Sequence, residues 1–520
     1  MSIFSRIDIL WNTVKYLKPI QWRYRVKLWG RRFHSQYLQI SDIVPVARVL
    51  NFVPSLSNER TYLGNNTFNF LNLQKSFGEK VDWECVELGR LWGYNLNYFE
   101  FLNQEVISVE EGMRLIRDFI QHFPKANMGV EPYPLSLRSV NWIRFLSSHN
   151  IEEVDIDTTL YTQLNLLIGK LEYHLLGNHL LENGFALLFG AYYFNDSAFY
   201  KKAKSILVPE LREQVLGDGG HFERSPMYHC IMLYRVLDCY NLVHNNTLFG
   251  RELEVFLREK AETMLGWLRE IIYRDGKIPL LNDAAFGIAP VAKDLMEYGQ
   301  RLGITCCKKV KLKESGYRKL QFGKFELLMD VGEVGPDYQP GHAHADTFSF
   351  ELYINGRPVI VDTGTSTYEV NDTRFYERST AAHNTIVVSG QNSSQVWAGH
   401  RVARRARVRV ICDEEERVVA QHDGYKRLGT LHTRGVEKIE ENIRIVDEID
   451  GEGCAYLHFM PEEKIILNGN IITGSDFCIE LNGTRTIESF SSWYASEFNK
   501  RVERQSFRIF FDRRLETIIK

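Results

Sequence analysis

The sequence predicts a two-part protein, with an α-helical first half followed by an antiparallel β-sandwich. Up to about residue 315 the apolar residues recur at steps of three and four, as in 160–176, 179–194 and 228–243. This is the period of an amphipathic helix. After about residue 318 short β-rich runs alternate with Asn-Gly and Asp-Gly turns, which is typical of antiparallel sheets. A chain of 520 residues also exceeds one ordinary core.

The helical half reads as many helices joined by short breaks that contain Gly, Pro, Asn or Asp, such as 217–226 and 279–287. Helices in up-down order with short connections favour an α/α arrangement, which is a bundle, a solenoid or a toroid. A lysine-rich stretch at 308–319 resembles a connector. We therefore expect three parts: residues 1–60 as a basic segment packed on the helical domain, the helical domain at 61–315, and the β domain at 316–520.

The second half contains at least nine stretches with the composition and alternation of strands. A large antiparallel β-sandwich accommodates this many short strands. The stretches are 324–331, 347–354, 357–364, 384–390, 406–412, 417–423, 441–449, 455–460 and 506–511. Turns are expected at Asn355-Gly356, Asp423-Gly424, Asp450-Gly451 and Asn482-Gly483.

Composition and charge exclude several classes of protein. The net charge is −3 and no domain is basic, so nucleic-acid binding has no support, and an acidic ligand must meet a local basic groove. The eight cysteines form no CxxC pair, which excludes a disulfide framework or a zinc finger. No run of about 18 apolar residues is present, so no membrane span is expected.

The N-terminal segment is basic and amphipathic, and it lacks the apolar core of a secretion signal. We therefore expect a cytoplasmic protein. Two interpretations of the basic residues remain open: a packed helix with a solvated basic face, and peripheral contact with the anionic inner face of a membrane. The residues are Lys15, Lys18, Arg23, Arg25, Lys27, Arg31 and Arg32.

The densest group of candidate functional residues begins at GHAHADTFSF, residues 341–350. His342 and His344 are two apart at the start of an expected strand, so they should point to the same side, and Asp346 continues that face. Asp362 and His383 follow in later β segments. Imidazole and carboxylate groups in this pattern suit a divalent metal, or one histidine acts as a base. The alternative is a set of hydrogen-bonded surface histidines.

A second group lies in GNHLLENG, residues 177–184, where Asn178 and Glu182 share a helix face and His179 is adjacent. The alternative is an ordinary helix start with Asn178 as the N-cap. A third group is HFERSPMYH, residues 221–229.

In this third group Ser225 and Pro226 match an N-cap followed by the first helical residue, which puts Tyr228 in the first turn. The helix dipole would favour a phenolate there. The alternative is an aromatic ring that only packs against the helix.

In this order, NHLLENG, RSPMYH, GHAHAD, VDTG and HNT resemble the heparinase II/III superfamily of polysaccharide lyases, over roughly residues 90–460. The resemblance implies an incomplete α/α toroid followed by an antiparallel β-sandwich. It also implies β-elimination on an acidic, uronate-containing polysaccharide, which leaves an unsaturated uronate end. Because no secretion signal is seen, we expect a role in surface-polysaccharide metabolism or action on imported oligosaccharides.

The resemblance also implies roles for individual residues. Asn178 and His179 match the groups that neutralise the uronate carboxylate, and such donors stabilise the developing enediolate. Tyr228 matches the tyrosine that protonates the leaving O4 oxygen and, for one C5 epimer, also removes the C5 proton. His342 matches the base that serves the other epimer.

The remaining matches concern a metal and the substrate groove. His344, Asp362 and His383 match the ligands of a structural Zn2+. Segments 93–102 and 132–145 resemble groove-lining helices. The candidate substrate-binding residues are Asn95, Arg138, Glu182, Arg224 and Arg378.

Three other functions compete with a lyase. The first is a non-catalytic polysaccharide-binding or assembly protein on the same fold. The second is a glycoside hydrolase that uses Glu182 and Glu223 as paired carboxylates. The third is a metal-dependent oxygenase, because two histidines, an aspartate and a further histidine also suit iron.

Overall fold

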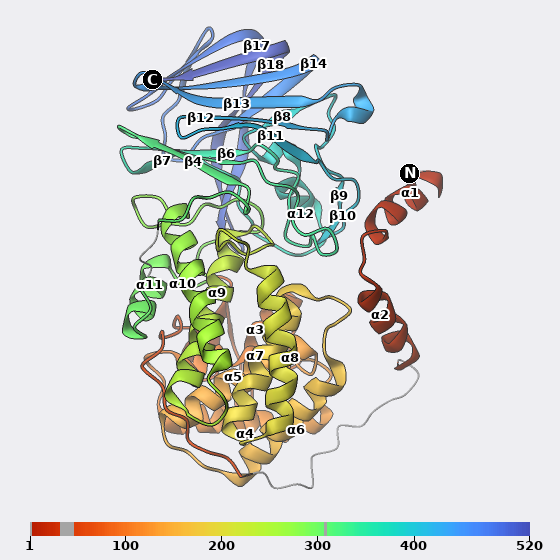
Figure 1. Cartoon of the computed structure of the whole chain (residues 1–520), viewed down its shortest axis with the longest axis vertical. Helices are drawn as coiled ribbons and strands as arrows, with labels where there is room; N and C mark the ends of the chain where they lie inside the picture. Colours follow the sequence, from red (N-terminus) through yellow and green to blue (C-terminus); the bar gives the residue numbers. More distant parts are fainter. Residues whose placement is uncertain (1–2, 32–45, 306–308) are drawn as a thin grey trace.

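The computed structural model describes residues 3–31, 46–305 and 309–520, and it consists of a helical half and a β half (Figure 1). The helical half contains a small antiparallel sheet and nine helices among the described residues. The strands are β1 (Tyr62–Gly64), β2 (Thr67–Phe70) and β3 (Leu73–Ser76); the helices are α3 (Arg90–Tyr98), α4 (Val109–His122), α5 (Pro132–Ser148), α6 (Val154–Lys170), α7 (Gly177–Tyr193), α8 (Ser197–Gln214), α9 (Pro226–Asn245), α10 (Glu252–Ile271) and α11 (Ala292–Arg301).

Three helices, α5, α7 and α9, form the centre of the helical half. Almost every residue of α7 is buried, which is expected of a helix surrounded by other helices rather than one with a solvent face. Its neighbours are α5, α6, α8 and α9. A functional side chain reaches the surface only at the ends of these helices, and the N-termini of α7 and α9 lie on the side that faces the β half (Figure 1).

The β half is built from two main antiparallel sheets and a two-stranded antiparallel sheet, β10-β9. One has the order β4-β5-β6-β7, and the other has the order β11-β12-β13-β14-β18-β17-β16-β15, with β8 paired to β14. Leu327, Phe350, Ile445 and Phe507 belong to the shared core of the two sheets. The strands are β4 (Tyr317–Phe322), β5 (Phe325–Asp330), β6 (Phe350–Ile354), β7 (Arg357–Ile360), β8 (Ile386–Val387), β9 (Val396–Trp397), β10 (Arg401–Val402), β11 (Val408–Asp413), β12 (Arg417–His422), β13 (His432–Ile439), β14 (Asn442–His458), β15 (Ile466–Asn468), β16 (Ile471–Thr473), β17 (Cys478–Glu497) and β18 (Lys500–Ile519).

Two expected turns are absent because the strands are longer than their sequence suggests. Asp450-Gly451 lies inside β14 and Asn482-Gly483 inside β17, and the strand register shifts at each position. A bulge absorbs the left-handed glycine without ending the strand. Asn355-Gly356 does connect β6 to β7 as expected, with φ values of 54° and 72°.

The N-terminal segment contacts both halves, whereas the sequence suggested packing on the helical half alone. Helix α1 (Ile3–Val14) places Asp8 against Arg404 of the β half, 2.6 Å apart. Helix α2 (Pro19–Arg31) donates from Gln21 to the carbonyl of Leu175 in the helical half. Over the ranges that the structure describes, no helix is both long and apolar enough to cross a bilayer.

Candidate active site

The N-termini of α7 and α9 and the loop before β6 meet where the helical half contacts the β half. Ser225 caps α9 by accepting a hydrogen bond from the main-chain N–H of Tyr228, as its Ser-Pro sequence predicts. This cap places Tyr228 in the first turn. Asn178 is the second residue of α7, so it lies in the first turn and is not the N-cap.

Three side chains and the main-chain N–H of Asn178 form a continuous contact path across the two halves. The ring of His342, from the β half, stacks on the ring of Tyr228 with centroids 3.8 Å apart and an interplanar angle of 18°. His342 Nδ1 is hydrogen-bonded to the buried carboxylate of Glu223. The other carboxylate oxygen accepts the main-chain N–H of Asn178 at 3.3 Å. Glu223 therefore fixes the ring of His342 relative to the start of α7 and leaves Nε2 for another partner.

Tyr228 is a buried, neutral phenol. Burial raises the pKa of Tyr228 above its ordinary value, despite the hydrogen bond between its hydroxyl and that of Tyr368 at 3.2 Å. The sequence suggested that the helix dipole would favour a phenolate. Burial acts in the opposite direction and favours the neutral form. The protonated hydroxyl suits a proton donor.

The two histidines of the GHAHAD motif lie in a loop rather than at the start of a strand, and their hydrogen-bond partners differ, Glu223 for His342 and Asp283 for His344. Residues 341–349 form a loop, and β6 begins only at Phe350. The loop's main chain bonds to the helical half: the carbonyl of His342 accepts from the N–H of Asp283, and the N–H of His344 donates to Asn282. Because these bonds replace a strand partner, the alternation of side chains is lost.

His179 stands beside the path formed by Asn178, Glu223, His342 and Tyr228. Its Nδ1 lies 3.1 Å from Glu172 and its ring packs on Tyr133. Burial opposes the charged ring, but the carboxylate of Glu172 outweighs it and raises the pKa of His179. The imidazole is therefore a candidate cation for an acidic ligand.

A buried ionic cluster joins the two halves behind these residues. Asp283, in the loop after α10, accepts from both Nη1 and Nη2 of Arg374, with 2.7 Å between Oδ2 and Nη2. Its Oδ1 also lies 2.8 Å from Nε2 of His344. Arg374 belongs to α12 (Asp372–Glu377), and its guanidinium also lies over the ring of Tyr368. Although burial opposes its charge, Arg374 holds the pKa of Asp283 well below the ordinary range.

Comparison with known proteins agrees with this architecture. Residues 135–299 match the model of the heparinase II/III N-terminus, and residues 308–519 match the heparinase II/III-like C-terminal model. The chain belongs to the heparinase II/III family. The expected fold class is also confirmed, since the solved structure of a heparinase III superposes with a TM-score of 0.66 over 98% of this chain and 92% of that one, at 16% identity.

Other matches cover less of this chain. The heparin-sulfate lyase of Bacteroides stercoris is 25% identical over 372 residues, covering 64% of this chain and 54% of that protein. The FtsZ-localized protein C of Caulobacter vibrioides is 26% identical over 267 residues, covering 48% and 44%. The chain thus spans about half the length of the curated relatives that it matches. A heparan sulfate lyase structure from Pedobacter heparinus superposes with a TM-score of 0.54 at 16% identity, covering 88% of this chain and 81% of that one.

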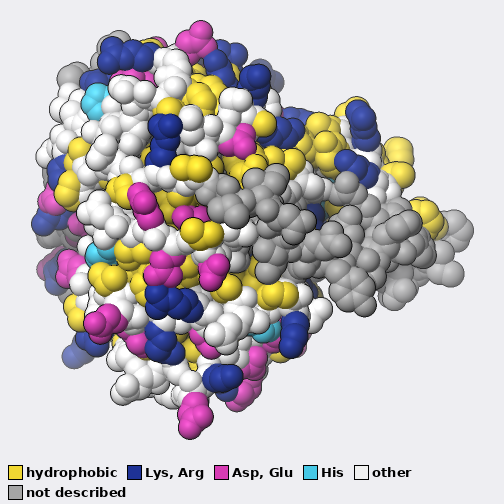
Figure 2. All heavy atoms as spheres, turned by 90° about the horizontal axis from the view of Figure 1, so that it is seen from below, with side chains coloured by type: hydrophobic (Ala, Val, Ile, Leu, Met, Phe, Trp, Pro, Cys, Tyr) yellow, Lys and Arg dark blue, Asp and Glu magenta, His cyan; other side chains and the backbone are white. Residues whose placement is uncertain are grey.

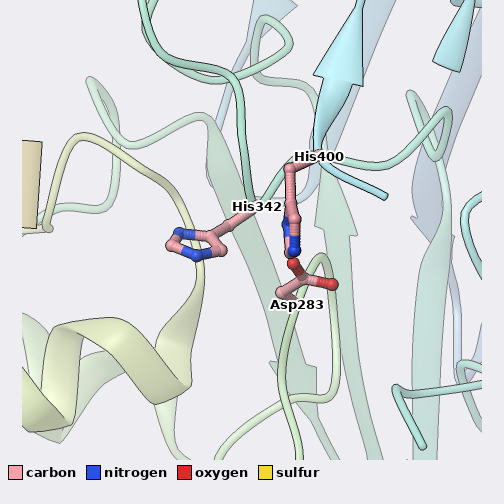
Figure 3. Close-up of side chains that lie close together, drawn as sticks. All are labelled: Asp283, His342 and His400. Atoms are coloured by element: carbon pink, nitrogen blue, oxygen red, sulfur yellow. The ribbon is translucent and has the colours of Figure 1, made fainter. Parts of the chain in front are cut away.

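The heparinase II/III site in this chain has two places with grouped metal-ligand atoms. Among the described residues, Asp283, His342 and His400 form the group whose ligand atoms all lie within 4.8 Å of one another (Figure 3). The carboxylate of Asp283 already binds the cation of Arg374, so a metal ion there would face a positive neighbour. Compactness alone therefore does not favour this group as a metal centre.

The three expected zinc ligands lie together at the second place but make different bonds. The rings of His344 and His383 are 5.3 Å apart, and each leaves one buried nitrogen without a partner, Nδ1 and Nε2 respectively. Asp362 is 2.8 Å from Nδ1 of His383. The carboxylate oxygen that lacks a partner is Oδ2 of Asp346. Two orphaned imidazole nitrogens and one orphaned carboxylate oxygen are donor types that suit a divalent metal, but among the described residues they do not form a group with all ligand atoms within 4.8 Å of one another.

Several expected substrate-binding residues have structural contacts instead. Arg138 is fully buried and donates to Gln163 and to the carbonyls of Asn97 and Gly129. Arg378 is also buried and donates to main-chain carbonyls, including that of Ala343. A guanidinium whose donors are used inside the protein cannot grip a substrate, so these two assignments are corrected.

The other three expected substrate-binding residues, Asn95, Glu182 and Arg224, differ in accessibility. Glu182 is fully buried against Arg235 at 3.1 Å, which removes it from any substrate surface. Asn95 is half-buried and donates to the carbonyl of Leu91 within its own helix. Arg224 is half-buried and donates to the carbonyl of Glu333.

Sequence reasoning missed Tyr368, Asp283, Arg374 and His400. Asp283 lies in PLLNDAAFG, where the sequence indicates only a break between helices. Arg374 lies in a short helix between two strands that gave no signal of its own. An aspartate in a loop and an arginine 91 positions later show no pattern, because the pairing is created by the contact between the two halves.

Proposed function

We propose that the protein is a polysaccharide lyase that cleaves an acidic, uronate-containing polysaccharide by β-elimination. The observation that carries this proposal is the path from Asn178 through Glu223 and His342 to Tyr228. It brings an amide, an oriented imidazole and a neutral phenol together at one place. The relatives named as heparin-sulfate lyases support the same reaction class.

Neutralising the substrate carboxylate is the first requirement, because removal of the C5 proton transfers negative charge to that group. The side-chain oxygen of Asn178 is buried without a hydrogen-bond partner, so its amide group is not used to hold the fold. Its position in the first turn of α7 adds the positive end of a helix dipole. The neighbouring imidazolium of His179 adds a second favourable charge.

Proton transfer is the second requirement. Nε2 of His342 takes the C5 proton, the electron pair of that C–H bond forms the C4–C5 double bond, and the C4–O4 bond breaks. The hydroxyl of Tyr228 gives its proton to the departing O4 oxygen. Since burial raises the pKa of Tyr228, the phenol remains a donor at neutral pH and the rate should hold into the alkaline range.

The decisive variant is Tyr228→Phe, which keeps the ring stacked on His342 and removes only the hydroxyl. We expect kcat to fall by about 10²–10⁴-fold, the range for one general acid-base group. The assay is ultraviolet absorbance of the unsaturated product, measured on a panel of heparan-type, alginate-type and other uronate polymers.

Tyr161→Phe is the matched control, since this half-buried hydroxyl in α6 contacts only Asp196 at 3.4 Å. It should keep full activity. If no uronate polymer yields an unsaturated product, the protein is a binding or assembly protein. Release of reducing sugar without the double bond would indicate a hydrolase, which the burial of Glu182 against Arg235 disfavours.

We also propose that Zn2+ is held by His344 and His383 together with Asp346, with Asp362 orienting His383. The support is the three buried ligand atoms without partners. When bound, the metal supplies a positive charge that braces the loop carrying His342.

Metal content tests the zinc assignment. Mass spectrometry of the purified protein should find about one zinc per chain, and Asp346→Asn should lose it. His122→Ala removes a histidine at the end of α4 that pairs with Glu84. This variant should keep the zinc. Full zinc content in Asp346→Asn, with loss in Asp362→Asn, would instead make Asp362 the ligand.

A further inference from the structure

Among the side chains that the structure describes, the two N-terminal helices expose several large apolar ones, and their buried faces combine Ile9 of α1 with polar residues. In α1, Ile7, Leu10 and Trp11 recur at helical spacing and are 58%, 47% and 64% exposed. The face of α1 that packs on the protein includes the polar Asn12, which is 8% exposed. A helix that only stabilised the fold would turn its apolar stripe inward.

Helix α2 has the same orientation. Trp22, Val26 and Trp29, at positions i, i+4 and i+7, are 47%, 66% and 67% exposed. The buried side chain is that of Gln21, which donates to the carbonyl of Leu175. Both helices are therefore held on one face by a mixture of polar contacts and apolar ones, such as the ring of Tyr24 on that of Tyr173. They present an aromatic and aliphatic face to solvent.

Basic residues border these apolar stripes. Side chains between residues 7 and 29 include five basic groups and one acidic group, whereas the whole chain has a net charge of −3. The acidic group, Asp8, is neutralised by Arg404. Arg23 and Lys27 are exposed next to Trp22 and Val26. Figure 2 shows hydrophobic and basic side chains intermixed on the projection that these helices form.

We propose that the outward face of α1 and α2 docks on an anionic lipid surface. Exposed tryptophans are suited to the headgroup region, where an apolar ring with a polar N–H is favoured, and lysine and arginine add attraction to anionic lipids. A second copy of this chain fits the face poorly, because two such faces would oppose like charges. This inference does not depend on the lyase reaction, since lipid binding requires no substrate.

The surface has a fixed orientation relative to the active site. Helix α1 is tied to the β half through Asp8–Arg404 and through a hydrogen bond from Trp397 to Thr13. Between α1 and α2, Lys18 lies over the ring of Tyr338, 3.9 Å from its centroid, in the loop that leads to His342. A membrane bound at this face would therefore hold the active site at a set angle to the bilayer.

Sedimentation with vesicles tests the proposal. The full chain should bind vesicles that contain phosphatidylglycerol and should not bind pure phosphatidylcholine. The double variant Trp11→Ser/Trp22→Ser should lose most of this binding. Trp493→Ser is the matched control, because that tryptophan is 45% exposed on β17, away from α1 and α2. It should bind as the wild type does.

A second pair of variants tests the charges. Arg23→Glu/Lys27→Glu should weaken binding by roughly tenfold or more, and added salt should weaken the wild type because the charges are exposed. Lys309→Glu/Lys311→Glu reverses two exposed charges in the connector and should bind normally.

Three results would overturn the inference. One is the absence of binding to anionic vesicles, and another is equal loss of binding in the control variants. The third is a wild-type dimer in solution that becomes monomeric in Trp11→Ser/Trp22→Ser, which would assign the face to contact between copies.

Discussion

Glu223 contacts one functional group from each half of the molecule. Its carboxylate accepts from the main chain of Asn178 on one oxygen and binds Nδ1 of His342 on the other. Burial opposes its charge, but His342 outweighs that effect and lowers the pKa of Glu223. A permanent carboxylate here fixes which ring nitrogen of His342 carries the proton and which one faces the substrate.

Glu223→Gln tests this positioning role. We expect kcat to fall by up to about 10⁴-fold, the scale reached when a histidine base loses its orienting carboxylate, with little change in KM. Glu223→Asp, which keeps a carboxylate, should recover part of the activity. A loss of kcat that only follows a loss of folded protein would mean that Glu223 supports only the fold.

Glu210→Gln serves as the control for this prediction. Glu210 is half-buried in α8 and bonds to Gln214 of the same helix. Its replacement should leave kcat unchanged.

For single residues, the sequence predicts a position within a helix better than it predicts the contacts of a side chain. Tyr228 could be placed in a first turn because Ser225 and Pro226 have side-chain and ring chemistry specific to helix starts. Arg138 could not be assigned correctly, because a buried arginine and a substrate-binding arginine have the same local sequence signal. Only the packing of α5 against its neighbours shows that its donors are used internally.

Among the elements, the start of α7 is the most constrained. Gly177 has a φ of 61°, a left-handed conformation that glycine tolerates and other residues rarely adopt. A Cβ atom at this position would also overlap the side-chain amide of Gln339. Gln339 is three residues before His342, so this contact sets the separation between α7 and the loop that carries the histidine.

Gly177→Ala should therefore lower kcat by more than any loss of folded protein would explain. We expect a loss of about 100-fold in kcat, the cost of misplacing a reacting group by about 1 Å. The measurement is kcat on folded protein, checked by its melting temperature. Gly169→Ala in α6, where an added Cβ meets nothing within 4 Å, should keep its activity and gain slightly in stability.

The elements of the fold were largely predictable because their periods are local. Helices α7 and α9 begin and end within a few residues of their expected ranges. The long strands β14 and β17 were not predictable, since Asp450-Gly451 and Asn482-Gly483 have the same composition whether they form a turn or a bulge. The neighbouring strand β18 decides between these outcomes.

For the whole molecule, the ion pair between Asp283 and Arg374 is the main buried link between the halves. Both side chains are fully buried, and Asp283 also holds His344. Asp283→Asn leaves the guanidinium of Arg374 buried without a counter-ion. We expect the free energy of unfolding to fall by about 3–5 kcal/mol, measured by denaturant titration.

Asp218→Asn is the comparison for this prediction. Asp218 is also buried, but its partners are neutral groups such as the hydroxyl of Ser315. Its replacement should cost only about 1–2 kcal/mol. Equal losses in the two variants would show that the charge pair adds nothing beyond ordinary hydrogen bonds.

The division of the reacting groups between two halves has a consequence for exchanging parts among relatives. A chimera of this helical half and the β half of another family member would keep all the residues of each half. It would still lose activity unless two contacts between the halves were restored. Glu223 must meet a histidine at the position of His342, and Asp283 must meet an arginine at the position of Arg374. Substitutions in one half are therefore constrained by residues in the other, so the two halves must change together.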